Sequence, residues 1–192
     1  MPANTPIKVC SRASVLMGGS PISSFDEGTV EADVVNAMYE DIARAALTNT
    51  RWRFATNQQI LNRLTAEPTS RFDAAYQMPS DLLMLSAVTV NDDPIMYDTY
   101  GDKIFCDTNT NEVVVADYIF RATEGTWPSY FTLAVEFQVA AMLSISVARD
   151  ASLGSMMDQQ AERQMIKARR LDSQQQTTRK LSTSRFIAQR RS

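Results

Sequence analysis

The fold of this chain depends most on one stretch, which runs from Trp127 to Arg149 and reads WPSYFTLAVEFQVAAMLSISVAR. Pro128 suits the first turn of a helix, and we predict a helix from Pro128 to Arg149. This helix is apolar on every side, so it needs cover all round, either at the centre of a bundle or from neighbouring subunits. Glu136 near its middle argues against a membrane span, since a charge there costs about 2.5–3.5 kcal/mol.

Three further helices are predicted to supply this cover. The first runs from Lys8 to Met17 and ends at a Gly-Gly pair. The second runs from Val30 to Asn49 behind the N-cap Thr29. Its apolar residues recur at helical spacing and predict the packed face: Val30, Val34, Met38, Ile42 and Ala45. The last runs from about Ser152 to Gln175. Residues 1–50 and 126–176 are therefore expected to form a bundle of about four helices.

Residues 51–125, between these helices, change to the alternation typical of β-strands. The first predicted elements are an extended run from Trp52 to Leu64, in which a helix is also allowed, an alternating run from Phe72 to Met78, and a strand from Leu82 to Val90. The next are a turn at Asn91 to Pro94, a return strand from Ile95 to Tyr97, and a hairpin of Ile104 to Cys106 with Val113 to Phe120. The fold class is therefore α+β: a helical bundle with an inserted antiparallel β region and an extended C-terminal tail.

The residue types needed for most catalytic sites are absent from the sequence. The chain has no histidine, which removes the commonest general base and the commonest zinc ligand. No Gly-rich phosphate loop is present, and Cys10 and Cys106 form no metal or redox motif, so we expect two reduced buried thiols. We therefore predict no enzyme, with no catalytic residue, cofactor or metal. The eight acids from Asp92 to Glu124 are interpreted as a solvated acidic surface, with a metal site as the weaker alternative.

The charge of the chain is divided very unequally along its length. Residues 1–160 hold 20 acids and 10 bases, whereas residues 161–192 hold 2 acids and 9 bases. An acidic body with a basic tail predicts that the tail seeks an acidic partner surface, either nucleic acid or another subunit. Residues 177–192 are predicted to form an extended docking arm. Its expected contact residues are Arg179, Lys180, Leu181, Arg185, Phe186, Ile187, Arg190 and Arg191.

Several short segments follow one another in an order that is itself informative. They are the Gly-Gly and Pro stretch Leu16 to Pro21, the acid-started helix Glu31 to Leu47, RWRFA at 51–55, YQMPSDL at 76–82, GDKI at 101–104, DYI at 117–119, WPSYF at 127–131 and ARRLDSQQ at 168–175. In this order, over nearly the whole chain, they resemble the tail tubular protein A family, the head-to-tail adaptors of short-tailed bacteriophages. The resemblance implies a helical bundle carrying a β insertion.

The resemblance also implies a function. It implies a twelve-fold ring of identical subunits below the portal, with double-stranded DNA passing through the lumen without specific binding and a tail tube or nozzle protein below. We thus expect a structural virion protein at the head–tail interface, made in the host cytoplasm, with no membrane partner. Acids expected to face the channel and repel DNA are Asp92, Asp93, Asp98, Asp102 and Asp107. The alternative is a nucleic-acid-binding accessory protein that uses the basic tail.

Overall fold

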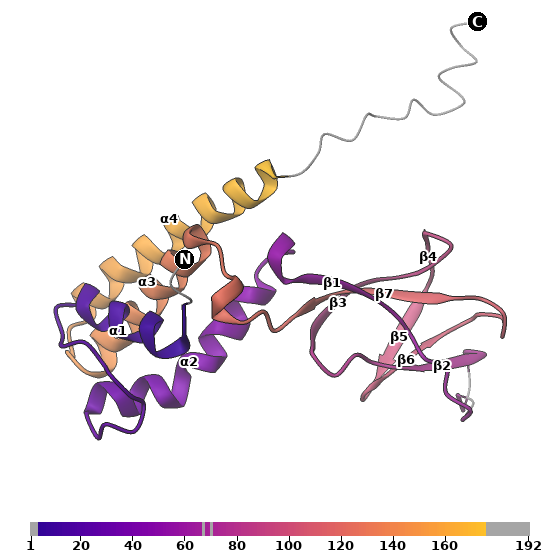
Figure 1. Ribbon diagram of the computed structural model, residues 1–192, viewed down its shortest axis with the longest axis horizontal. Coiled ribbons are helices and arrows are strands. Elements are labelled where there is room, and N and C mark those ends of the chain that lie inside the picture. The colour runs from indigo at the N-terminus through magenta and orange to yellow at the C-terminus, as the bar shows by residue number, and fades with distance from the viewer. Residues whose placement is uncertain (1–3, 67, 70, 176–192) are drawn as a thin grey trace, which may run out of the picture.

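The computed structural model describes residues 4–66, 68–69 and 71–175. Within them the chain is α+β, as predicted, with four α-helices and two antiparallel sheets. Figure 1 shows the helices gathered at one end of an elongated molecule and the strands at the other. The predicted docking arm, residues 177–192, lies outside the described residues. So do all of its expected contact residues: Arg179, Lys180, Leu181, Arg185, Phe186, Ile187, Arg190 and Arg191.

The four helices begin and end close to the predicted positions. They are α1 (Pro6–Leu16), α2 (Val30–Thr48), α3 (Ser129–Ser146) and α4 (Ala151–Gln174). The N-cap Thr29 accepts a hydrogen bond from the backbone N–H of Ala32, as expected. The predicted end of α3 at Arg149 is wrong. The helix stops at Ser146 because Arg149 takes a positive φ of 53° and Asp150 then caps α4, accepting hydrogen bonds from Ser152 and Leu153.

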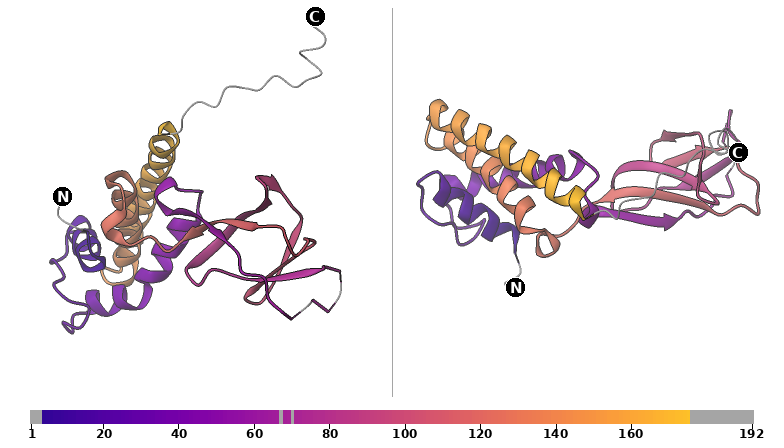
Figure 2. Two further views of the ribbon diagram at one scale, coloured as in Figure 1. Left: turned by 45° about the vertical axis from the view of Figure 1, so that its right-hand side comes forward. Right: turned by 90° about the horizontal axis from the view of Figure 1, so that it is seen from above.

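The central helix α3 is covered by the other three helices over part of its surface, while Leu133 and Ile145 stay exposed. Helices α1, α2 and α4 each pack against it, with α4 running back along its length (Figure 2). Ten of its 18 residues are buried. By length and composition α3 is apolar enough to cross a membrane, but more than half of it is buried against its own chain, as in the core helix of a globular bundle.

The packed face of α2 differs from the predicted one. The side of α2 that enters the core is formed mainly by small residues and one tyrosine: Ala32, Val35, Tyr39, Ala43, Ala46 and Leu47. The predicted stripe lies to one side of this face, with Val30 62% exposed and Met38 45% exposed. Helical periodicity finds an apolar stripe, but alanines let α2 approach α3 more closely than the larger side chains would. The predicted packed face is therefore only partly covered: Val34 and Ile42 pack at the edge of the core, whereas Val30, Met38 and Ala45 are exposed.

The β region is built from two small sheets that face each other across their own core. One sheet has the order β1-β7-β3-β4 and contains Thr56–Ile60, Val114–Phe120, Leu82–Val90 and Asp93–Pro94. The other has the order β2-β6-β5 and contains Ala74–Gln77, Lys103–Cys106 and Tyr97–Tyr100. Short 3-10 turns at Arg53–Ala55 and Glu124–Thr126 lie at the two crossings between helices and strands.

Three strand predictions are wrong in detail. Residues Ile104–Cys106 and Val113–Phe120 do not form a hairpin, because β6 pairs with β2 and β5 whereas β7 pairs with β1 and β3. Their buried residues meet across the core instead. The return strand is Asp93–Pro94 rather than Ile95–Tyr97, since Asn91 and Asp92 both take positive φ and turn the chain in two residues. The extended run from Trp52 is interrupted by the turn at Arg53–Ala55.

Aromatic residues and both cysteines lie inside the molecule. Trp52 is fully buried, and its Nε1 donates a hydrogen bond to the carbonyl of Ala46 over 2.9 Å. Its ring meets Phe131 edge-on at 5.0 Å, so Trp52 belongs to the core. Cys10 and Cys106 are free and buried, as predicted. Burial raises the pKa of Cys10 to about 12, which leaves this thiol protonated and unreactive.

Candidate interaction surfaces

An open apolar groove runs between α2, α3 and α4. Helices α2 and α4 both pack on α3 and leave between them a groove of about 600 Å³. Its walls include Met38, Ile42, Met142, Ile145, Gly154 and Ser155. Ile145 is 59% exposed, and with Met38 it forms a rim that nothing in the described chain covers. An uncovered apolar groove of this kind is typical of an interaction site.

Two polar groups mark this groove. Asp158 is the one charged residue in its described lining. Gln138 also lines the groove, but its side-chain oxygen Oε1 is closed off from solvent and has no hydrogen-bond partner among the described residues. Among the described residues it is the single buried side-chain polar atom in that state. An unpaired buried acceptor costs about 1–3 kcal/mol, and because this oxygen is closed off from solvent the cost lies within the packing of α3.

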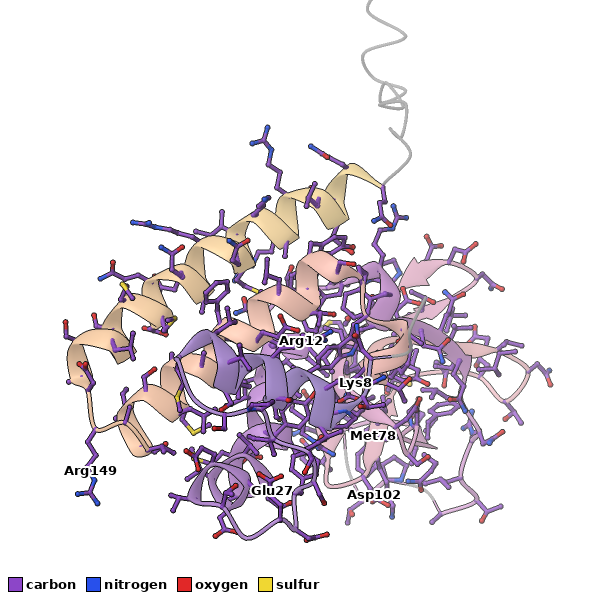
Figure 3. All side chains as sticks on the ribbon, turned by 60° about the vertical axis from the view of Figure 1, so that its left-hand side comes forward. Lys8, Arg12, Glu27, Met78, Asp102 and Arg149 are labelled. Atoms are coloured by element: carbon purple, nitrogen blue, oxygen red, sulfur yellow. The ribbon has the colours of Figure 1, made fainter. Side chains whose placement is uncertain are left out.

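A second exposed apolar surface lies on α1 and α3. Val15 is 54% exposed near the end of α1, and Leu133 on α3 is 37% exposed. Beside Val15 is a shallower pocket of about 310 Å³, in which Arg12 pairs with Glu136 of α3 over 2.5 Å. Figure 3 shows Arg12 on α1 and Arg149 pointing outward at the far tip of the helices. The helical end of the molecule thus presents two different apolar faces, one bordered by α2 and one by α1.

The Arg12–Glu136 pair has a cost of its own. Glu136 is 6% exposed, and burial raises the pKa of its carboxyl above the ordinary 4.5 although Arg12 opposes this shift. Arg12 is half exposed, so water screens its attraction. The ionised carboxylate is therefore less favourable in the folded chain than in the unfolded chain.

This raised pKa predicts a pH-dependent stability. A folded chain that holds its proton more tightly loses stability as pH rises from 4.5 through the raised pKa of Glu136. We expect Glu136→Gln to remove that loss, so the variant gains on the wild type as pH rises through this window. Urea unfolding of both proteins between pH 4 and pH 7 measures the difference. The opposite slope, with the wild type gaining as pH rises, would mean that Arg12 outweighs burial.

A charged network holds the helices to the base of the β region. Arg121 donates from Nη2 to Glu124 over 2.6 Å and to Glu40 of α2 over 2.9 Å. Tyr39 donates from its hydroxyl to Glu124 over 3.0 Å, and Glu124 is 5% exposed. The hydrogen bond from Arg121 lowers the pKa of Glu40. Each buried charge here is paired, so the network is read as structural.

A polar cleft lies where α4 ends. Its described lining contains three arginines, Arg51, Arg53 and Arg169, and one acid, Asp172. Asp172 is buried and fully used, accepting from the backbone N–H of Arg53 over 3.1 Å and from the hydroxyl of Tyr130 over 2.9 Å. Three of the four charged residues in its described lining are therefore arginines, and the cleft lies beside the last turn of α4.

The acids expected to face a channel are all on the surface. The exposed residues are Asp92, Asp93, Asp98, Asp102 and Asp107. They come from the β3–β4 turn, strand β4, strand β5, the β5–β6 turn and the segment after β6, and Figure 3 labels Asp102 on the β side. Asp102 accepts a hydrogen bond from Gln77, which lowers its pKa. Within the described ranges, no three His, Cys, Asp or Glu side chains gather as metal ligands.

No protein family model matches this chain, and no curated protein matches it either. The surfaces above therefore carry the functional argument. The groove and the α1–α3 face were not predicted as sites from the sequence. One feature of the sequence does indicate the groove: α2 carries a stripe of large apolar residues and a second stripe rich in alanine. A surface helix can bury only one such stripe fully in its own core.

Proposed function

We propose that this chain is a structural virion protein, one subunit of the adaptor ring that joins the portal to the tail and forms part of the DNA channel. The observation that supports it most is the partly uncovered apolar stripe of α2, with Val30 62% and Met38 45% exposed. This stripe continues into the α2–α3–α4 groove. Apolar surface that one chain leaves open is explained if other subunits cover it.

Two different apolar faces suit a ring better than a symmetric dimer. In a two-fold dimer each subunit offers the same patch, whereas in a ring one face of each subunit meets a different face of the next. The groove side and the Val15–Leu133 side supply such a pair of faces on one bundle. The role requires no catalytic group, in keeping with a chain that has no histidine.

The exposed acids fit passage of DNA through the ring. Asp98 on β5 and Asp102 in the next turn carry charge of the same sign as the DNA backbone. Like charge along a channel wall keeps DNA from adhering as it passes. The portal above and a tail tube or nozzle protein below are the expected partners at the two ends of the ring.

A single charge in the α1–α3 face tests the ring contact. We expect Leu133→Glu to stay folded, since Leu133 is 37% exposed, but to lose most of its occupancy on portal-filled heads. Burying an unpaired carboxylate between subunits is strongly unfavourable. Leu133→Met keeps the face apolar and serves as the matched control. Quantitative gels of purified heads give the occupancy, and wild-type occupancy for Leu133→Glu would remove this face from the contact.

The polar cleft favours a second candidate function, a nucleic-acid-binding accessory protein. Arg51, Arg53 and Arg169 surround this cleft, and the basic tail follows directly along the chain. Such a protein binds duplex DNA with an affinity that falls steeply as salt rises. A filter-binding titration at several salt concentrations separates the candidates. Under the ring proposal the free subunit shows no appreciable DNA affinity at physiological salt.

A further inference from the structure

We propose that the α2–α3–α4 groove is the binding site for the chain's own C-terminal arm, residues 177–192, in the free subunit. The groove is apolar, open and bordered by the first turns of α4. The arm is the part of the sequence that follows α4. A tethered segment binds at high effective concentration, so even a weak site on the same molecule is filled.

The chemistry of the groove matches that of the arm. The arm has three large apolar residues, Leu181, Phe186 and Ile187, and five bases without an acid. The groove offers apolar walls, the carboxylate of Asp158 and no described base in its lining.

The length of the arm matches the position of the groove. Helix α4 ends at Gln174 and rises about 1.5 Å per residue, so Asp158 lies roughly 24 Å back along it. In the proposed placement, residues 175–178 reverse the direction of the chain. The arm then runs back along α4 from residue 178 as an extended strand, at about 3.4 Å per residue. Arg185 then lies roughly 24 Å back as well, level with Asp158. Phe186 and Ile187 follow directly, level with the groove-lining residues Gly154 and Ser155.

A second pair of residues lines up between Gln174 and the groove. Ile166 of α4 is 65% exposed, and it is 11 residues after Ser155, which places both on one side of the helix. Ile166 is roughly 12 Å back from Gln174, and Leu181 of a reversed arm lies roughly 10 Å back. One antiparallel placement thus covers Ile166 with Leu181 and fills the groove with Phe186 and Ile187.

This placement gives the arm a role before assembly. The groove it fills is one of the two faces that the ring proposal assigns to a neighbouring subunit. A free subunit with its arm in the groove therefore hides that face. When the arm binds elsewhere, the groove opens for the next subunit.

Disulfide trapping in the free full-length chain tests the placement. In this placement, Ala188 of the arm and Ala151 of the groove are both roughly 34 Å back from Gln174. The two cysteines introduced by Ala151→Cys and Ala188→Cys are therefore expected to form a disulfide within one chain. Ser152→Cys with Ala188→Cys is the matched control, since Ser152 is exposed and adjacent but turned about 100° around the helix. Cys10 and Cys106 are fully buried, so they do not compete with the introduced cysteines for disulfide formation.

Equilibration of the dilute proteins in a glutathione buffer measures the effective concentration of the two thiols. We expect an intramolecular disulfide in the Ala151 pair, a markedly lower yield in the Ser152 pair, and a loss of about tenfold or more when Phe186→Ala is added to the Ala151 pair. Equal yields in both pairs, or no effect of Phe186→Ala, would overturn the placement. A disulfide between two chains would instead show that the groove takes a neighbour's arm. None of these outcomes depends on ring formation, so the ring proposal is tested separately.

Discussion

Replacing Arg121 with alanine is expected to destabilise the folded chain by about 3–5 kcal/mol, because it leaves a buried carboxylate without its cationic partner. The guanidinium of Arg121 lies 2.6 Å from Oε1 of Glu124, whose side chain is almost completely buried. Arg121 also lies 5.6 Å from the ring of Trp127 and donates to the carbonyl of Ala122. After the substitution, the hydroxyl of Tyr39 is the one described side-chain group that still donates to Glu124.

Two further variants separate the buried pair from its exposed neighbour. Glu40→Ala removes the other acidic partner of Arg121, but that side chain is 51% exposed, so the loss is expected to be about 0–1 kcal/mol. The double variant Arg121→Met with Glu124→Gln removes both buried charges and is expected to recover much of the loss. Chemical unfolding monitored by circular dichroism gives the three free energies. A loss for Arg121→Ala no larger than that for Glu40→Ala would mean that water reaches Glu124.

The second large effect concerns attachment rather than stability. A chain that ends at Gln176 is expected to stay folded by circular dichroism, since all described helices and strands end before that residue, but to fail to join portal-filled heads. Burying Leu181, Phe186 and Ile187 contributes roughly 1.5–3 kcal/mol each, and the conformational entropy lost when the arm is ordered offsets much of this gain. One arm therefore binds weakly, and a ring of arms binds stably through high effective concentration.

The apolar and basic residues of the arm are expected to contribute differently. Exposed ion pairs from residues such as Arg190 are worth about 0–1 kcal/mol and weaken with salt. Phe186→Ala should therefore reduce attachment more than Arg190→Ala at physiological salt. Particle counts by gel after purification of the heads measure both variants and the truncated chain. If the truncated chain attaches at wild-type occupancy, the arm is a solvated end and not a docking element.

How far the sequence predicts this structure is clear from three elements. The central place of the helix that begins near Pro128 was predicted because its sequence is apolar on every side, and α3 indeed packs against the other three helices. The packed face of α2 was predicted wrongly, because the rule that large apolar residues pack inward takes no account of alanine-mediated close approach. Strands β6 and β7 were paired wrongly because adjacency in the chain cannot tell one sheet from two facing sheets.

The candidate sites also divide into features that the sequence predicts and features that need the folded structure. The solvated acidic surface was predicted from composition and is wrong for Glu124, which is buried and paired with Arg121. The basic arm lies outside the described residues. The groove needed the structure, since Met38, Met142 and Ser155 come from three helices far apart in the chain. The unpaired oxygen of Gln138 likewise depends on how α3 packs, which no local pattern reveals.

The proposal that many copies of this chain form a ring on the portal is tested most directly by particle mass. Purified portal is mixed with an excess of the chain, and the complex is weighed by native mass spectrometry. The ring account, with the twelve copies that the family resemblance implies, predicts an added mass of about 260 kDa, twelve times the 21.5 kDa chain. A particle that gains one or two copies, or a chain that leaves the portal mass unchanged, would contradict it.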